Sequence, residues 1–167
     1  MKNKKLLLDI KEYLKCYEDQ VLEDWYELIR HISVSETGEG IETCCDWIQK
    51  KMEEIGIQVI KYSVKPAPVL VGRFGNDPEK KTVLIYAHYD VKPAGERKLW
   101  HSDPFVPTVR DGKVYARGSA DNKSPLMAHL KALEYFVRKK MEVPVNVIFV
   151  FEGDEECGSR GLEEFLA

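Results

Sequence analysis

Residues 145–159 read VNVIFVFEGDEECGS, and this stretch decides the fold. Its first half, VNVIFVF, is a short apolar run rich in β-branched and aromatic residues, which is the pattern of a buried strand. Four acidic residues then follow within the five positions 152–156. In open α/β sheets, functional sites gather outside the carboxyl ends of the strands. The stretch therefore predicts a buried strand with a site directly after it.

The sequence before this stretch alternates between helical and strand-like periods. Apolar residues recur at three- and four-residue spacing from position 14 to position 32, and a second helix is expected at about 41–55. After Gly56, which suits a helix C-cap, the period changes. Further segments are expected as strands at 57–64, 69–74, 82–87 and 113–116, and as a helix at 126–137. This alternation predicts an α/β fold with a largely parallel central sheet.

Length and composition are those of an ordinary soluble domain. The chain has 167 residues, 44% hydrophobic and 32% charged, with a formal net charge of −3. Nucleic-acid binding would require a basic stripe, which this balance does not favour. The apolar run at 6–8 ends at Asp9, too short for a signal-peptide core, and no stretch reaches the ~18 apolar residues of a membrane span. We therefore expect a cytoplasmic protein without nucleic-acid or membrane partners.

The first candidate site residues lie at the end of the expected strand 82–87. His88 and Asp90 are two positions apart, and in an extended chain such residues point to the same face. Asp90 is thus placed to hold one nitrogen of a metal-bound His88, as carboxylates commonly do. The alternative interpretation is a strand-end His and Asp that pair with each other or with water.

Asp121 lies between the expected strand at 113–116 and the helix that follows. It suits a carboxylate that bridges two metal ions, although a helix-start carboxylate stabilised by the helix dipole explains it equally well. The acids after residue 151 are harder to explain as a solvated face, because clustered carboxylates repel and need a compensating cation. In such a cluster one acid can bind metal while its neighbour acts as a general base. Together, these residues predict a hydrolytic two-metal site.

At these positions the sequence resembles the M20 metallopeptidase family, especially its carnosinase-like dipeptidases. The resemblance covers about 84–162, and four ordered motifs carry it: HYDVKP at 88–93, W100 with DPF at 103–105, GSADNK at 118–123, and EECGS at 155–159. It implies a three-layer αβα fold like that of zinc exopeptidases. Ser124 departs from the family, which usually has Gly there.

The resemblance also implies a role for each site residue. His88 would bind one metal ion, Glu156 would bind the other, and Asp121 would bridge both. Glu155 would be the general base that takes a proton from the activated water, and Asp90 would orient His88. The expected cofactor is a pair of Zn²⁺ ions, with Mn²⁺ or Co²⁺ as alternatives, and the expected substrate is a dipeptide or short peptide.

The ligand count is incomplete, because a catalytic zinc commonly has three protein ligands and each ion here lacks about one. We therefore expect residues 1–167 to be the N-terminal part of a metallopeptidase catalytic domain, without its C-terminal catalytic segment and lid or dimerisation domain. A full-length form would be a homodimer. Two alternatives remain: a non-catalytic remnant or interaction module, and a same-family deacylase of N-acyl amino acids. The preferred substrate and native metal are not predicted.

Overall fold

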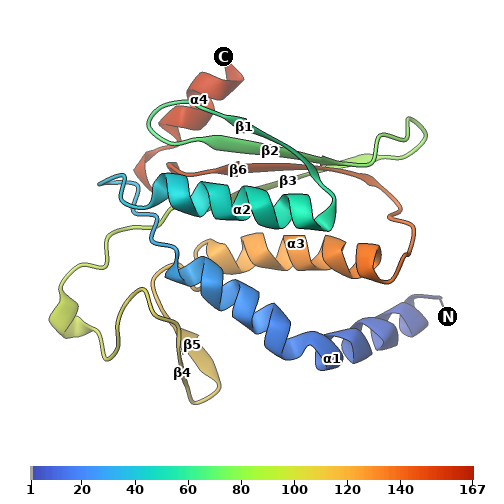
Figure 1. The fold of residues 1–167 in the computed structure, drawn as a ribbon, viewed down its shortest axis with the longest axis horizontal. Helices are drawn as coiled ribbons and strands as arrows, with labels where there is room; N and C mark the ends of the chain where they lie inside the picture. Colours follow the sequence, from blue (N-terminus) through green and yellow to red (C-terminus); the bar gives the residue numbers. More distant parts are fainter. Residues whose placement is uncertain (1) are drawn as a thin grey trace.

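The computed structural model describes residues 2–167, with side chains described from residue 4. Its centre is a four-stranded sheet in the order β1-β2-β6-β3 (Figure 1). These strands span Gln58–Tyr62 (β1), Val69–Phe74 (β2), Thr82–His88 (β3) and Asn146–Glu152 (β6). The predicted buried strand is therefore confirmed as β6, which lies between β2 and β3.

The sheet is mixed, whereas a largely parallel one was expected. Only β3 and β6 are parallel, while β1 with β2 and β2 with β6 are antiparallel. The six residues between β1 and β2 suffice for a hairpin, whereas a parallel pair needs a long crossover such as the one through α3 (Lys123–Arg138). The α/β class is confirmed, and the expected parallel arrangement applies to the pair that carries the site.

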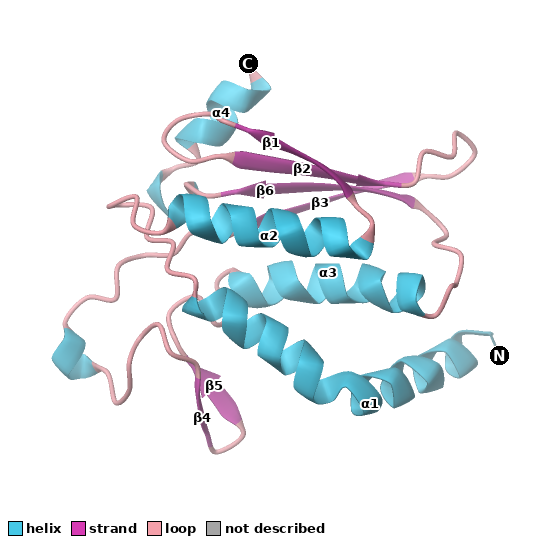
Figure 2. Ribbon diagram, viewed as in Figure 1, coloured by secondary structure: helices cyan, strands magenta, loops and turns pink. Residues whose placement is uncertain are grey.

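The long helices lie on one side of the sheet (Figure 2). Helices α2 (Ile41–Ile55) and α3 cover that face, and α1 (Lys2–Arg30) packs against α3 farther from the sheet. Phe149 and Phe151 of β6 are fully buried there, together with Leu126 and Leu130 of α3. These alternating strand residues and helix residues four apart form the core that fixes the strand ends in place.

The opposite face of the sheet is only partly covered. Helix α4 (Arg160–Leu166) lies over β1 and β2, where the Phe165 and Tyr62 rings are 4.8 Å apart. Leu84 and Tyr86 of β3 point to this face and are 63% and 44% exposed. The expected αβα arrangement has helices on both faces of the sheet. Among the described elements, α4 makes up the helical layer on this second face.

The remaining strands form a separate hairpin beside the helices. They are β4 (Thr108–Arg110) and β5 (Lys113–Tyr115), which pair only with each other, and a short η1 turn (Arg97–Leu99) precedes them. The expectation that 113–116 belongs to the central sheet was therefore wrong, because this segment pairs with its own neighbour across a tight turn. Within residues 2–167, no helix is long and apolar enough to cross a membrane.

Candidate metal centre

The site begins where β3 and β6 leave the sheet side by side. Their parallel register aligns His88 with Glu152, and the Tyr89 N–H donates to the Glu152 carbonyl at 2.8 Å. Consequently the segment after His88 and the acidic segment after Glu152 start from adjacent points. A short η2 turn (Glu155–Cys157) then folds the acidic segment back toward β3.

Asp90 lies at the centre of this arrangement and is fully buried. Its Oδ1 is 3.2 Å from Nδ1 of His88, and its two oxygens accept the backbone N–H groups of Glu155 at 3.2 Å and Glu156 at 3.1 Å. Burial acts to raise the pKa of Asp90, but hydrogen bonds from His88, Ser35 and the Glu156 N–H outweigh it and lower the pKa. A single ionised carboxylate therefore orients both the histidine and the acidic turn.

Asp121 approaches His88 from a different direction, namely from the turn just before α3. Its Oδ1 is 3.1 Å from Nε2 of His88, and Oε2 of Glu155 is 3.6 Å from the same nitrogen. The Asp121 side chain is 74% exposed, so it faces the open side of the site. The structure thus brings His88, Asp90, Asp121 and Glu155 together, although Asp121 does not follow a strand of the central sheet.

Glu156 contacts the site through its backbone, while its carboxylate lies near a lysine. Its backbone N–H contacts Asp90, but its Oε2 lies 3.8 Å from the Lys92 ammonium. Burial and the negative charge of Asp121 both raise the pKa of Glu156, while Lys92 and His88 act against them. A nearby cation would stabilise the ionised form of such a carboxylate.

The charge around His88 has a similar effect on its imidazole. Burial acts to lower the pKa of His88, but the hydrogen bond and charge of Asp90, with the charges of Glu155 and Asp121, raise it to about 9. The imidazole is therefore surrounded by anions. A divalent ion bound to Nε2 would replace the proton as the compensating charge.

A tetrahedral zinc ion requires a definite spacing between its ligands. Two ligands of one tetrahedral zinc, each at about 2.1 Å, lie roughly 3.4 Å apart. The 3.1 Å separation of His88 Nε2 and Asp121 Oδ1 suits such a pair. Across the described residues, however, no three His, Cys, Asp or Glu side chains converge closely enough to hold an ion. His88 and Asp121 can therefore serve as two ligands of one ion. The coordination sphere of that ion is incomplete with the described residues alone.

The other two acids of the cluster have structural contacts. Glu152 accepts from the Tyr86 hydroxyl at 2.5 Å and the Ser159 hydroxyl at 2.8 Å, and burial raises its pKa. Asp154 is 1% exposed and binds the Arg160 guanidinium at 2.7 Å. The cluster therefore divides into two acids that anchor the loop and two that face the site.

Sequence reasoning missed the contribution of the polar break after α1. Ser33 Oγ donates to the Tyr89 carbonyl at 2.7 Å, and the Val91 N–H donates to the Ser33 carbonyl at 2.8 Å. These bonds fix the chain on both sides of Asp90. The only signal in the sequence was a serine-rich break before a helix, which also occurs in ordinary loops.

A protein-family model matches the region that holds the candidate metal ligands. The model of "Peptidase family M20/M25/M40" matches residues 84–167. The chain belongs to this family. This match confirms the M20 resemblance inferred from the four motifs, all of which lie within the matched residues.

Individual M20 relatives agree with this assignment. A Cys-Gly metallodipeptidase of Schizosaccharomyces pombe is 43% identical over 120 residues, which are 70% of this chain and 25% of the relative. The human Beta-Ala-His dipeptidase is 46% identical over 99 residues, covering 59% of this chain and 20% of the relative. The chain therefore spans about a quarter of the length of the curated M20 relatives it matches.

A solved structure shows the same fold. The crystal structure of human carnosine dipeptidase 1 superposes with a TM-score of 0.88 and 32% sequence identity. The superposition covers 93% of this chain and 36% of that structure. The fold of this chain is therefore that of part of an M20 peptidase catalytic domain.

Proposed function

We propose that this chain supplies the N-terminal part of the catalytic domain of a metal-dependent dipeptidase. The observation that carries the proposal is the position of His88 at the end of β3, where Asp90 lies against Nδ1 and Asp121 and Glu155 lie 3.1 Å and 3.6 Å from Nε2. The names of the relatives, a Cys-Gly metallodipeptidase and a Beta-Ala-His dipeptidase, support dipeptides as the substrate class.

In this proposal the metal is held by side chains of three segments. His88 and Asp121 would hold one ion, and Asp121 with Glu156 would hold a second. Zinc suits this mixture of imidazole and carboxylate donors, and Mn²⁺ or Co²⁺ are alternatives. When bound, such ions lower the pKa of a water molecule and polarise the scissile carbonyl.

Glu155 is proposed as the general base. Its Oε2 lies 3.6 Å from His88 Nε2, and its side chain is 43% exposed, so it can reach both the site and a substrate. There it takes the proton from the attacking water and passes it to the leaving amine. Asp90 keeps the His88 imidazole oriented by holding Nδ1, which leaves Nε2 for the metal.

The proposal includes ligands outside this chain. Each ion is short of about one protein ligand, and the M20 relatives are about four times as long as the matched region. We therefore propose that a longer form supplies an additional carboxylate and a histidine, and forms a homodimer. The 167-residue chain alone should bind less than one equivalent of zinc and cleave no dipeptide.

The test compares the 167-residue chain with the full-length protein that contains it. Zinc content is measured by elemental analysis, and hydrolysis is followed with Cys-Gly, β-Ala-His and N-acyl amino acids. Turnover of dipeptides by the full-length protein supports the proposal, while turnover of only acyl amino acids favours a deacylase. Metal-free, inactive full-length protein would favour the remnant or interaction module.

A further inference from the structure

A buried lysine lies next to the site without any role in the proposed chemistry. Lys123 is the first residue of α3 and is 1% exposed. Its ammonium donates to the carbonyl of Leu28 at 3.1 Å and to that of His31. The Leu28 carbonyl belongs to the last turn of α1, where backbone acceptors lack helical partners and the dipole is negative, and His31 directly follows the helix. Since a buried charge is costly unless paired, these bonds hold Lys123 in one position.

Lys123 follows Asp121 by two residues, so its position constrains the turn that carries Asp121. A side-chain carbon added at Gly118 would lie 2.7 Å from Val91 and 3.3 Å from the Lys123 stem. The turn therefore wraps closely around the lysine. The Asp121 carboxylate is itself 74% exposed, with His88 as its polar contact. Its location thus depends on the backbone rather than on side-chain packing.

The same end of α1 also anchors the β3 segment of the site. Ser33 exchanges two hydrogen bonds with the chain around Asp90, through the Tyr89 carbonyl and the Val91 N–H. Two segments that carry candidate ligands are therefore positioned from one short stretch, residues 28–33. Lys123 is the link from that stretch to the Asp121 turn.

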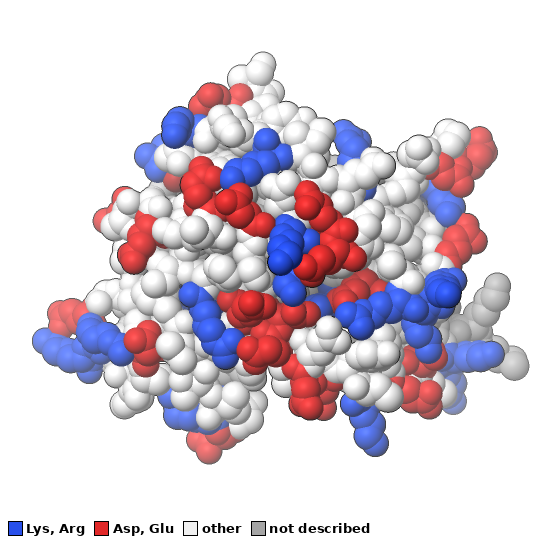
Figure 3. Space-filling view, in the orientation of Figure 1, with Lys and Arg blue, Asp and Glu red and all other residues white. Residues whose placement is uncertain are grey.

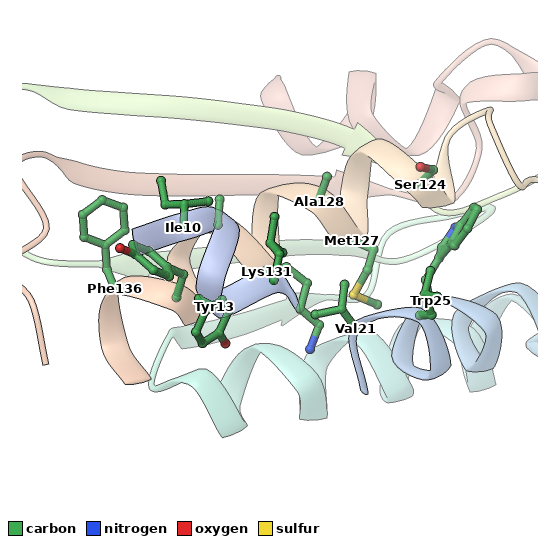
Figure 4. Close-up of a pocket in the computed structure, with 13 residues that line it drawn as sticks. Ile10, Tyr13, Val21, Trp25, Ser124, Met127, Ala128, Lys131 and Phe136 are labelled. Carbon is green, nitrogen blue, oxygen red and sulfur yellow. The ribbon is translucent and has the colours of Figure 1, made fainter. Parts of the chain in front are cut away.

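Apolar packing alone does not fix α1 against α3. A partly open pocket of about 390 Å³ lies between the two helices beside their contacts, and it extends from Phe136 at one end of α3 to Ser124 at the other (Figure 4). Across this gap Lys131 of α3 forms an ion pair with Asp24 of α1. Opposite charges intermingle on the surface of these helices (Figure 3). Lys123, Lys131 and the Tyr135 hydroxyl, which donates to Asp9, therefore all link α3 to α1 or to the residue after it, and of these three Lys123 adjoins the site.

We propose that Lys123 is a positioning residue for metal binding, which fixes the Asp121 turn against the end of α1 so that Asp121 and His88 meet at one ion. This inference rests on the proposed function, because it takes His88 and Asp121 as metal ligands. Lys123 acts through the backbone and touches neither the metal nor the substrate.

The test uses the full-length protein with Lys123→Met, which keeps the length of the side chain and removes the charge. Lys131→Met is the matched control, since it removes another lysine link between α3 and α1 that lies away from the site. Zinc affinity is measured by competition with a chromophoric chelator, and kcat and KM are measured with a dipeptide. Thermal unfolding monitors the fold, and Lys123→Gln, which retains a donor, serves as a second variant.

We expect Lys123→Met to weaken zinc affinity by about 10-fold or more, which is typical for loss of a residue that orients a ligand. We also expect kcat to fall by a similar factor, with KM changed less than about threefold. Lys131→Met should lower the melting temperature and leave zinc affinity within about twofold. If Lys123→Met does not fold, Lys123→Gln should show the same selective loss.

Three results would overturn the inference. They are wild-type zinc affinity in folded Lys123→Met, equal losses of zinc affinity in the Lys123 and Lys131 variants, and failure of both Lys123 variants to fold. If the wild-type protein binds zinc but cleaves no dipeptide, the proposed function fails while the zinc-affinity comparison still decides the role of Lys123.

Discussion

The backbone N–H of Glu156 donates to Oδ2 of Asp90 at 3.1 Å, and this bond joins the acidic turn after β6 to the histidine segment after β3. The other oxygen of Asp90 accepts from Glu155 and lies against His88. Asp90 therefore fixes the spacing between the proposed base and a proposed ligand. A carboxylate in this position does more than orient an imidazole, which was its expected role.

Replacing Asp90 with Asn should disrupt both segments. The amide presents an N–H₂ group where the carboxylate accepts from two backbone N–H groups, so at least one buried donor loses its partner. We expect the free energy of unfolding to fall by about 2–3 kcal/mol. In the full-length protein, zinc affinity should weaken by about 10- to 100-fold. Denaturant unfolding and chelator competition measure the two effects.

Asp103→Asn provides the control for Asp90→Asn, because Asp103 is a half-exposed aspartate in a loop. Its substitution should change the free energy of unfolding by less than about 0.5 kcal/mol. Equal stability and zinc affinity in Asp90→Asn and the wild type would show that Asp90 does not organise the site.

Gly153 separates β6 from the acidic turn, and space rather than backbone conformation requires a glycine there. An added Cβ would lie 2.5 Å from the Tyr89 ring, whose hydroxyl donates to the Pro68 carbonyl at 2.7 Å. Gly153→Ala should therefore displace the ring and destabilise the fold by about 1–3 kcal/mol. Thermal or denaturant unfolding measures this loss.

A double-mutant cycle tests the assigned cause of that loss. Tyr89→Leu removes the ring atoms that the new methyl group would meet. Gly153→Ala should then cost at least about 1 kcal/mol less in the Tyr89→Leu background than in the wild type. Strict additivity of the two substitutions would contradict a clash with Tyr89.

Sequence alone predicts that the ends of neighbouring strands meet at the site. It does not predict contacts between residues far apart in the chain. β3 and β6 follow from their apolar runs, and His88 and Glu155 are then adjacent because parallel strands end at one edge. Asp121 lies between a separate hairpin and the start of α3. The periodicity of the sequence does not predict that this turn lies beside His88. The bonds of Ser33 and Lys123 join residues 56 to 95 positions apart, and no local pattern specifies such partners.

The ion pair between Asp24 of α1 and Lys131 of α3 predicts that the free energy of unfolding depends on pH. Burial acts to raise the pKa of Asp24, but hydrogen bonds and charge from Lys131 and Lys51 outweigh it and lower the pKa. A carboxylate whose folded pKa is lowered stabilises the fold above its unfolded pKa, about 3.8, and loses that contribution as pH falls through the folded value. Stability should therefore decrease as the solution is acidified below about pH 4.

Asp24→Asn isolates this contribution. At pH 7 the variant should be less stable than the wild type by about 1–2 kcal/mol, since two partly buried ammonium groups each lose one of their two charged partners. The difference should shrink as the pH falls below 4. Denaturant titrations at several pH values measure it, and a pH-independent difference would exclude titration of Asp24 as its source.

Glu155→Gln separates metal binding from proton transfer in the full-length protein. The amide cannot accept a proton, while the ligands His88, Asp121 and Glu156 are untouched. Zinc content should remain near that of the wild type, and kcat should fall by about 10²-fold or more. Retention of most turnover would show that Glu155 is not the base.

The most direct measurement is the position of zinc in crystals of the full-length protein, located by anomalous scattering at the zinc edge. The account predicts a peak about 2.0–2.2 Å from His88 Nε2 and from an Asp121 oxygen, with a second peak beside Glu156. Zinc peaks away from these side chains, with His88 still hydrogen-bonded only to Asp90 and Asp121, would contradict it.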